Sequence, residues 1–252
     1  MTDLRADAAF AARTLRSVAE STDQLLRTAA ALAPESLAAP CALPGWTRGH
    51  LLAHLSRNAD SLVNLLESAR TGRDIPQYAS PDAREEGIEQ GAGRPLAEQL
   101  EDLHSSADRL AAAAATLPEE AWSVQLKHRH GYLFPAAELP WKRLEELEYH
   151  HVDLDAGYTP AHWSAEFAAT EFGKLTTAFA DRGLPALQLV CDDTADRARL
   201  GEGGPQLVVE GPVRALTAWL SGRSDGDGLQ VHRDGVQLTD PRTALPELPA
   251  MS

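Results

Sequence analysis

The chain has 252 residues, of which 43% are hydrophobic, and its formal net charge is −14 because 37 acidic residues outnumber 23 basic ones. Nucleic acids and anionic membranes repel a protein of this charge, so we expect neither as a partner. No apolar run is long enough to span a membrane and the first residues lack a signal peptide's hydrophobic core, so we expect a cytoplasmic protein. Its two cysteines, Cys41 and Cys191, are far apart and predict neither a disulfide framework nor a cysteine metal site.

The first part of the chain predicts two long helices and an irregular segment. Apolar residues recur at helical spacing over residues 3–33, which predicts a helix that ends before Pro34. Thr47 is a candidate amino-terminal cap, so a second helix should begin near Arg48. Residues 71–94 are rich in glycine, proline and charge, and a stretch of this length is expected to be a functional loop.

Two more helices with a hairpin between them should complete a bundle. A third helix is predicted over residues 95–117, and the alternation within residues 122–134 indicates a short hairpin. The fourth helix should begin at about Ala136. His128 and His130 could form a metal site, but alternation places them on one side of an exposed ribbon, which favours a surface role.

The pattern changes after Pro160. A helix over residues 164–180 is followed by short β-rich segments, another helix and a further strand, and this order cannot extend a helical bundle. A domain boundary near residue 160 is therefore predicted, with domains at 1–160 and 161–252. The proline-rich end from Pro241 is expected to be a tether or a disordered tail.

Two pairs of candidate metal ligands lie on predicted helices. Glu146 and His150 are four residues apart, and so are His50 and His54, which places each pair on one helical face. Glu146 and His150 could equally be a solvated surface pair, and His54, in an apolar stripe, could be a hydrogen-bonded core residue. Two histidines and one glutamate from two helices would form a three-ligand zinc site with an open fourth position, as in catalytic zinc sites.

Three segments carry a family resemblance: PGWTRGHLLAH, YASPDAREEGI and EYHHVDL. They resemble the mycothiol-dependent maleylpyruvate isomerases, whose amino-terminal domain is a DinB-like four-helix bundle. The resemblance implies a two-domain α+β protein. In it, residues 1–160 form a DinB-like up-down four-helix bundle that binds zinc, and residues 161–252 form a small α/β, sterol-carrier-like domain that completes the active site. It also implies that His54, Glu146 and His150 are the zinc ligands.

The resemblance further implies the reaction and its partners. The thiol cofactor mycothiol, activated by zinc as a thiolate, would add to the cis double bond of maleylpyruvate, and elimination after bond rotation would give fumarylpyruvate. Arg84 and Arg223 match the family's substrate-binding arginines, one from each domain. The expected partners are a small anionic substrate and a low-molecular-weight thiol, and we expect a monomer.

Four neighbouring residues have open roles. Tyr78 could hydrogen-bond to substrate or thiol, or could simply be packed in its loop. His50 could support His54, whereas His151 is turned away from His150 and is not expected to be a ligand. Asp153 could orient His150 or be an ordinary exposed acid.

Two other functions compete with the isomerase. A relative with the same zinc and thiol could transfer the thiol permanently to an electrophile, as in detoxification. A non-catalytic metal-binding or regulatory bundle would need no pair of substrate-binding arginines, so Arg84 and Arg223 count against it.

Overall fold

The computed structural model describes residues 7–204, 207–240 and 242–249 of the chain. It divides into two compact units, Met1–Tyr158 and Thr159–Ser252. The first unit is helical apart from one small hairpin, and the second combines helices with a mixed sheet. The predicted α+β class is therefore confirmed. None of the helices that the structure describes is both long and apolar enough to span a membrane.

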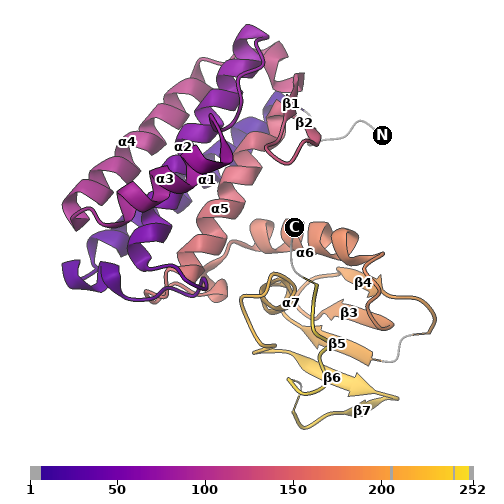
Figure 1. Cartoon of the computed structure of the whole chain (residues 1–252). Helices are drawn as coiled ribbons and strands as arrows, with labels where there is room; N and C mark the ends of the chain where they lie inside the picture. Colours follow the sequence, from indigo (N-terminus) through magenta and orange to yellow (C-terminus); the bar gives the residue numbers. More distant parts are fainter. Residues whose placement is uncertain (1–6, 205–206, 241, 250–252) are drawn as a thin grey trace. The chain divides into compact units, whose positions relative to one another are not determined.

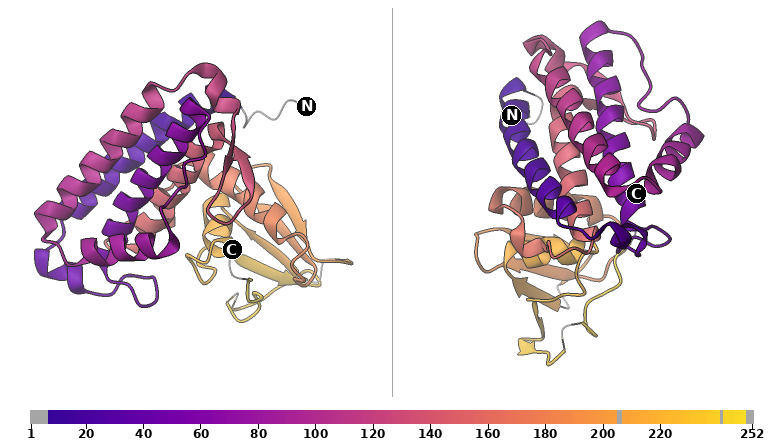
Figure 2. Two further views of the ribbon diagram at one scale, coloured as in Figure 1. Left: turned by 45° about the horizontal axis from the view of Figure 1, so that its top comes forward. Right: turned by 90° about the vertical axis from the view of Figure 1, so that its left-hand side faces the viewer.

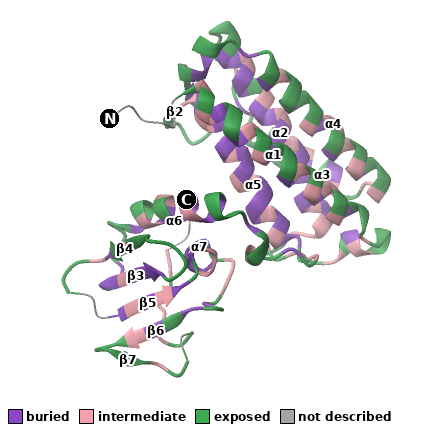
Figure 3. Cartoon of the chain, turned by 180° about the vertical axis from the view of Figure 1, so that it is seen from behind, coloured by how far each residue is buried: buried purple, intermediate pink, exposed green. Residues whose placement is uncertain are grey.

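Four long helices form the first unit (Figure 1, Figure 2). They are α1 (Ala8–Ala30), α2 (Arg48–Thr71), α4 (Leu96–Ala115) and α5 (Leu139–Asp153). Short 3-10 turns at Pro34–Ala38, Glu119–Ser123 and Ala136–Glu138 join them. Helices α1 and α2 each pack against both α4 and α5, which gives a four-helix bundle. Figure 3 shows that α5 is buried along most of its length.

The predicted start of the second helix is confirmed. The Thr47 side chain accepts a hydrogen bond from the backbone N–H of His50, and α2 begins one residue later, at Arg48. The helix ends at Gly72, whose φ of 69° lies in the left-handed region that favours glycine. Helix α1 ends at Ala30, ahead of Pro34, as its sequence predicted.

The segment predicted to be a loop, residues 71–94, contains a helix instead. Helix α3 spans Pro81–Ala92, with Ser80 capping its first turn and Pro81 at its first position. This helix packs closely on α2 at Gly91. A Cβ atom at that position would lie only 2.7 Å from the Cβ of Ala53, so a larger residue would not fit there without a shift. Gly91, one of the glycines that favoured a loop, therefore allows these two helices to pack closely.

The predicted hairpin is confirmed. Strands β1 (Gln125–Lys127) and β2 (Leu133–Pro135) pair antiparallel around the turn that contains His130 and Gly131. The fourth bundle helix begins slightly later than predicted, because Ala136–Glu138 form a 3-10 turn before α5.

The second unit is a five-stranded sheet with helices α6 (Ala165–Phe179) and α7 (Val213–Leu220) on the same side (Figure 1). A 3-10 turn at Pro160–His162 precedes α6. The strand order is β4-β3-β5-β6-β7, and among the described strand pairs β3 and β5 run parallel while the others are antiparallel. The strands are β3 (Leu187–Cys191), β4 (Arg197–Leu200), β5 (Leu207–Gly211), β6 (Gln230–Arg233) and β7 (Val236–Gln237).

The end of the chain differs from the predicted tether. Pro241 itself lies outside the described residues, but Ala244, Leu245 and Leu248 pack against the core between the sheet and its helices. Apolar side chains between the prolines allow this segment to bury surface. The prediction of a disordered tail is therefore wrong for residues 242–249.

Candidate metal centre

Three side chains from two bundle helices meet inside the first unit. His54 comes from α2, whereas Glu146 and His150 lie one turn apart on α5. The Nε2 atoms of His54 and His150 lie 2.9 Å and 3.2 Å from the same oxygen of Glu146, Oε2. All three potential ligand atoms lie within 4.8 Å of one another, so this group could hold a metal ion.

The charges at this cluster suit a cation. Burial would raise the pKa of Glu146, but the two histidines hold it well below its usual range, so the side chain is a carboxylate. Burial also lowers the pKa of His54, which is only 5% exposed, and this favours its neutral, metal-binding form. For His150 burial acts in the same direction, but Asp153 and Glu146 outweigh it and raise the pKa to about 9. Metal binding would therefore release a proton from His150.

Asp153 orients His150. Its carboxylate lies 2.9 Å from Nδ1 of His150, and this bond turns Nε2 toward Glu146. Asp153 is buried, so the alternative that it is an ordinary exposed acid is wrong. The Trp46 ring packs against His54, with its centroid 5.4 Å from that of the imidazole.

Helix α3 brings Arg84 to the same cluster. Its guanidinium NH2 lies 3.4 Å from Nδ1 of His54, and its NH1 forms an ion pair with Glu85. The sequence pattern assigned Arg84 to a loop, whereas the structure holds it on a helix that packs against α2. The backbone of Arg84 is therefore held by a packed helix close to the candidate ligands.

Arg223 lies in the second unit, in the turn after α7. Its NH1 donates a hydrogen bond to the carbonyl of Ser221, at 2.7 Å. Its membership of the site stays a prediction.

Two other histidines serve local structure. The ring of His50 takes part in the cap of α2 through Thr47, and its Nε2 lies 3.4 Å from Glu89. Both ring nitrogens are thus occupied, and the hypothesis that His50 supports His54 is wrong. His151 is not near the ligand group: its Nε2 lies 2.8 Å from the hydroxyl of Thr28, and its ring stacks on Tyr158.

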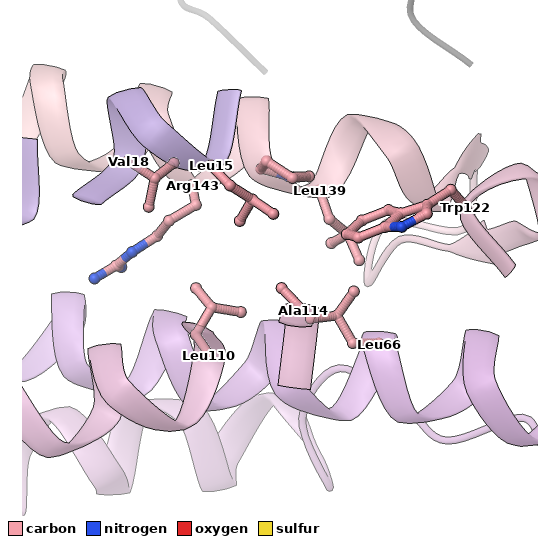
Figure 4. A pocket seen from close by; sticks show the side chains of 9 residues that line it. Leu15, Val18, Leu66, Leu110, Ala114, Trp122, Leu139 and Arg143 are labelled. Atoms are coloured by element: carbon pink, nitrogen blue, oxygen red, sulfur yellow. The ribbon is translucent and has the colours of Figure 1, made fainter. Parts of the chain in front are cut away.

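Sequence reasoning missed Arg143, which lies three residues before Glu146 on α5. Arg143 is 2% exposed, and its NH1 donates to the carbonyl of Leu55 and to Oδ1 of Asn58, both at 2.8 Å. Figure 4 shows its stem among apolar side chains of the bundle, including Val18 and Leu110. Burial lowers its pKa to about 10. Its spacing of three residues from Glu146 places it on the same helical face, and this was the signal in the sequence that could have identified it. Its hydrogen bonds connect α5 to α2 beside the cluster.

Comparison with known proteins places this geometry in context. A family model described as the mycothiol maleylpyruvate isomerase N-terminal domain matches residues 18–155. A crystal structure of a mycothiol-dependent maleylpyruvate isomerase is 29% identical, with a TM-score of 0.81 over 88% of this chain and 92% of that one. A histidine-to-alanine mutant of a mycothiol-dependent maleylpyruvate isomerase matches at 28% identity with the same TM-score and coverage. No curated protein sequence matches significantly.

Proposed function

Because the chain belongs to the mycothiol maleylpyruvate isomerase family, we propose that it is an enzyme that isomerises maleylpyruvate to fumarylpyruvate with mycothiol as cofactor. The observation that carries this proposal is the His54, Glu146 and His150 cluster, which lies within the matched residues. A cation, Arg84, stands directly beside it. This combination suits a reaction between a thiol and an anionic substrate.

We propose that zinc occupies this cluster, with His54, Glu146 and His150 as its ligands. Ligand atoms about 2.0–2.2 Å from a tetrahedral zinc ion lie roughly 3.3–3.5 Å apart. The two separations from Glu146 Oε2, 2.9 Å and 3.2 Å, are slightly shorter than this spacing, and all three ligand atoms lie within 4.8 Å of one another. Two imidazoles and one carboxylate are also the nitrogen and oxygen donors of catalytic zinc sites. Bound zinc would lower the pKa of a thiol, so that the thiolate exists at neutral pH.

The proposed reaction returns its thiol. The sulfur bonds to one carbon of the cis double bond, and the electron pair of that bond moves to the adjacent ketone as an enolate. The remaining single bond rotates, the enolate pair restores the double bond in the trans form, and the C–S bond breaks. Protons are neither gained nor lost overall. Arg84 would stabilise the negative charge that develops on the substrate.

Arg84 can change its partner when a metal binds. Coordination through Nε2 of His54 places that histidine's proton on Nδ1. Nδ1 then cannot accept a hydrogen bond from the Arg84 guanidinium, now 3.4 Å away. The arginine would thus have donors available for a substrate carboxylate. We propose that Arg223 supplies a second bidentate contact from the other domain, because an acidic protein needs local cations to hold a dianion.

One assay tests this function. Purified protein is mixed with maleylpyruvate, with and without mycothiol, and the substrate absorbance is followed together with the free thiol concentration. We expect decay only with mycothiol, and many turnovers for each thiol. Consumption of one thiol per product would support the transferase instead. No substrate decay under either condition would reject the isomerase and favour the non-catalytic bundle.

A further inference from the structure

A cavity of about 480 Å³ opens in the first unit, between residues 74–84 and the turn of the β1–β2 hairpin. Its volume is within the range of small-molecule sites. Three side chains that are positively charged at neutral pH line it: Arg84, Lys127 and Arg129. Only one carboxylate, Asp74, is among the residues that line it. The chain as a whole carries a charge of −14, so the sign of the charge is inverted in this cavity. A ligand recognised here should be anionic.

Burial and neighbouring positive charges both act on His128, which lines the cavity. Burial, followed by the charges of Lys142, His130 and Arg129, lowers the pKa of His128 to about 4. His128 is therefore neutral at pH 7 and can hydrogen-bond without adding charge.

The cavity wall is held in place by a buried glutamine. Gln77 is 7% exposed, and its Oε1 accepts a hydrogen bond from the backbone N–H of Arg129, at 3.3 Å. Its Nε2 donates to Ser61, and its carbonyl accepts from Asn64, so both segments are tied to α2. On the other side, Lys142 of α5 donates to the Tyr132 hydroxyl in the hairpin. The cavity is thus organised before any ligand binds, which reduces the entropic cost of binding.

One side chain connects the cavity with the candidate metal centre. Arg84 lines the cavity, and the same guanidinium lies 3.4 Å from His54. Within residues 7–204, 207–240 and 242–249, no carboxylate forms an ion pair with the side chain of Lys127 or Arg129. Both cations can therefore bind an anion without first breaking an ion pair.

We propose that this cavity binds the substrate carboxylate remote from the reacting double bond, and that Arg129 and Lys127 determine specificity for it. The inference rests on the proposed function. In maleylpyruvate one carboxylate adjoins the double bond, and the other ends the 2,4-dioxo acid portion at the opposite end of the molecule. The double bond must reach the thiol at the metal centre, so the far carboxylate needs its own cations. The cavity next to Arg84 provides them.

Direct binding tests the assignment without relying on turnover. Isothermal titration calorimetry would compare three probes that have no double bond to isomerise. They are 4,6-dioxoheptanedioate, which has both carboxylates; acetylpyruvate, which has only the far one; and levulinate, which has only the near one. In Arg129→Ala, the dissociation constants of the first two should rise about tenfold, as expected for a lost charged hydrogen bond, while that of levulinate stays unchanged.

Matched variants separate recognition from general charge effects. Arg13, exposed on α1, lies outside the cavity lining, so Arg13→Ala changes the net charge equally and should leave all three constants unchanged. Arg129→Lys should recover part of the loss, since it keeps the charge but not the two-donor fork. Equal weakening of levulinate, unchanged binding in Arg129→Ala, or no binding of any probe would overturn the assignment.

Kinetics distinguish this proposal from the proposed function. If the wild-type protein isomerises maleylpyruvate and Arg129→Ala shows an unchanged KM for it, the cavity assignment fails and the isomerase stands. If there is no isomerase activity but far-carboxylate binding depends on Arg129, the isomerase fails and the anion site stands. Where the protein isomerises maleylpyruvate, the KM for mycothiol should be the same in Arg129→Ala as in the wild type.

Discussion

Replacing Arg143 by methionine should lower the free energy of unfolding by only about 1 kcal/mol, whereas replacing it by alanine should lower it by about 3–4 kcal/mol. Arg143 is a buried cation with two hydrogen bonds from NH1 and no partner for its Nε atom among the described residues. The free energy gained from its hydrogen bonds and the free energy lost by burying its charge are of similar size. The change in stability therefore depends mainly on how well the replacement side chain fills the space.

The magnitudes follow from the site. Burial lowers the pKa of Arg143 from 12.5 to about 10, which corresponds to about 3 kcal/mol against the charged form. Two hydrogen bonds from a charged donor contribute about 1.5–3 kcal/mol each. Methionine removes both effects and fills most of the stem's volume, and the carbonyl of Leu55 keeps its bond within α2. Asn58 alone loses a buried partner. Alanine also leaves a hole among the apolar side chains of Figure 4.

Urea denaturation at pH 7 would measure both variants against the wild type, with unchanged m-values showing that the denatured state is comparable. Zinc affinity, measured on the same samples, should fall in both, because Arg143 ties α5 to α2 beside His54. A loss of more than about 3 kcal/mol in Arg143→Met would refute the reasoning, since the hydrogen bonds would then outweigh desolvation clearly. Equal losses in the two variants would show that no cavity forms.

Three further predictions concern the metal, the second domain and pH. His54→Ala and His150→Ala should each lose stoichiometric zinc by elemental analysis, while His104→Ala, an exposed histidine on α4, keeps it; zinc retained in both ligand variants would reject the assignment. Arg223→Ala should stay folded with full zinc but lose about 30- to 1000-fold in kcat/KM, with little recovery in Arg223→Lys; near-normal kinetics would remove the second domain from the site. The pKa of His128 falls from 6.5 to about 4 on folding, so the unfolded chain binds more protons between these values. The free energy of unfolding should therefore decrease as pH drops from 6.5 to 4, and the decrease should be smaller in His128→Gln. An equal decrease in the variant and the wild type would contradict the lowered pKa of His128.

Local sequence patterns determined the elements that depend only on neighbouring residues. Helical periodicity with a Thr47 cap predicted α2, because a cap acts within one turn of its own helix. Alternation predicted the β1–β2 hairpin. The four-residue spacing of Glu146 and His150 placed them on one face, since the helix repeat fixes that relation.

Tertiary structure decided which of these faces meet and what else they enclose. The glycines of residues 71–94 read as loop signals, and only the tertiary structure shows that Gly91 allows α3 to pack closely on α2. His50 and His54 have the same spacing and chemistry in the sequence, yet only His54 turns toward Glu146. The pairing of Arg143 with Leu55 joins residues 88 positions apart. Periodicity encodes the direction of a side chain around its own helix, but the partner it reaches depends on contacts between distant segments, which no local pattern specifies.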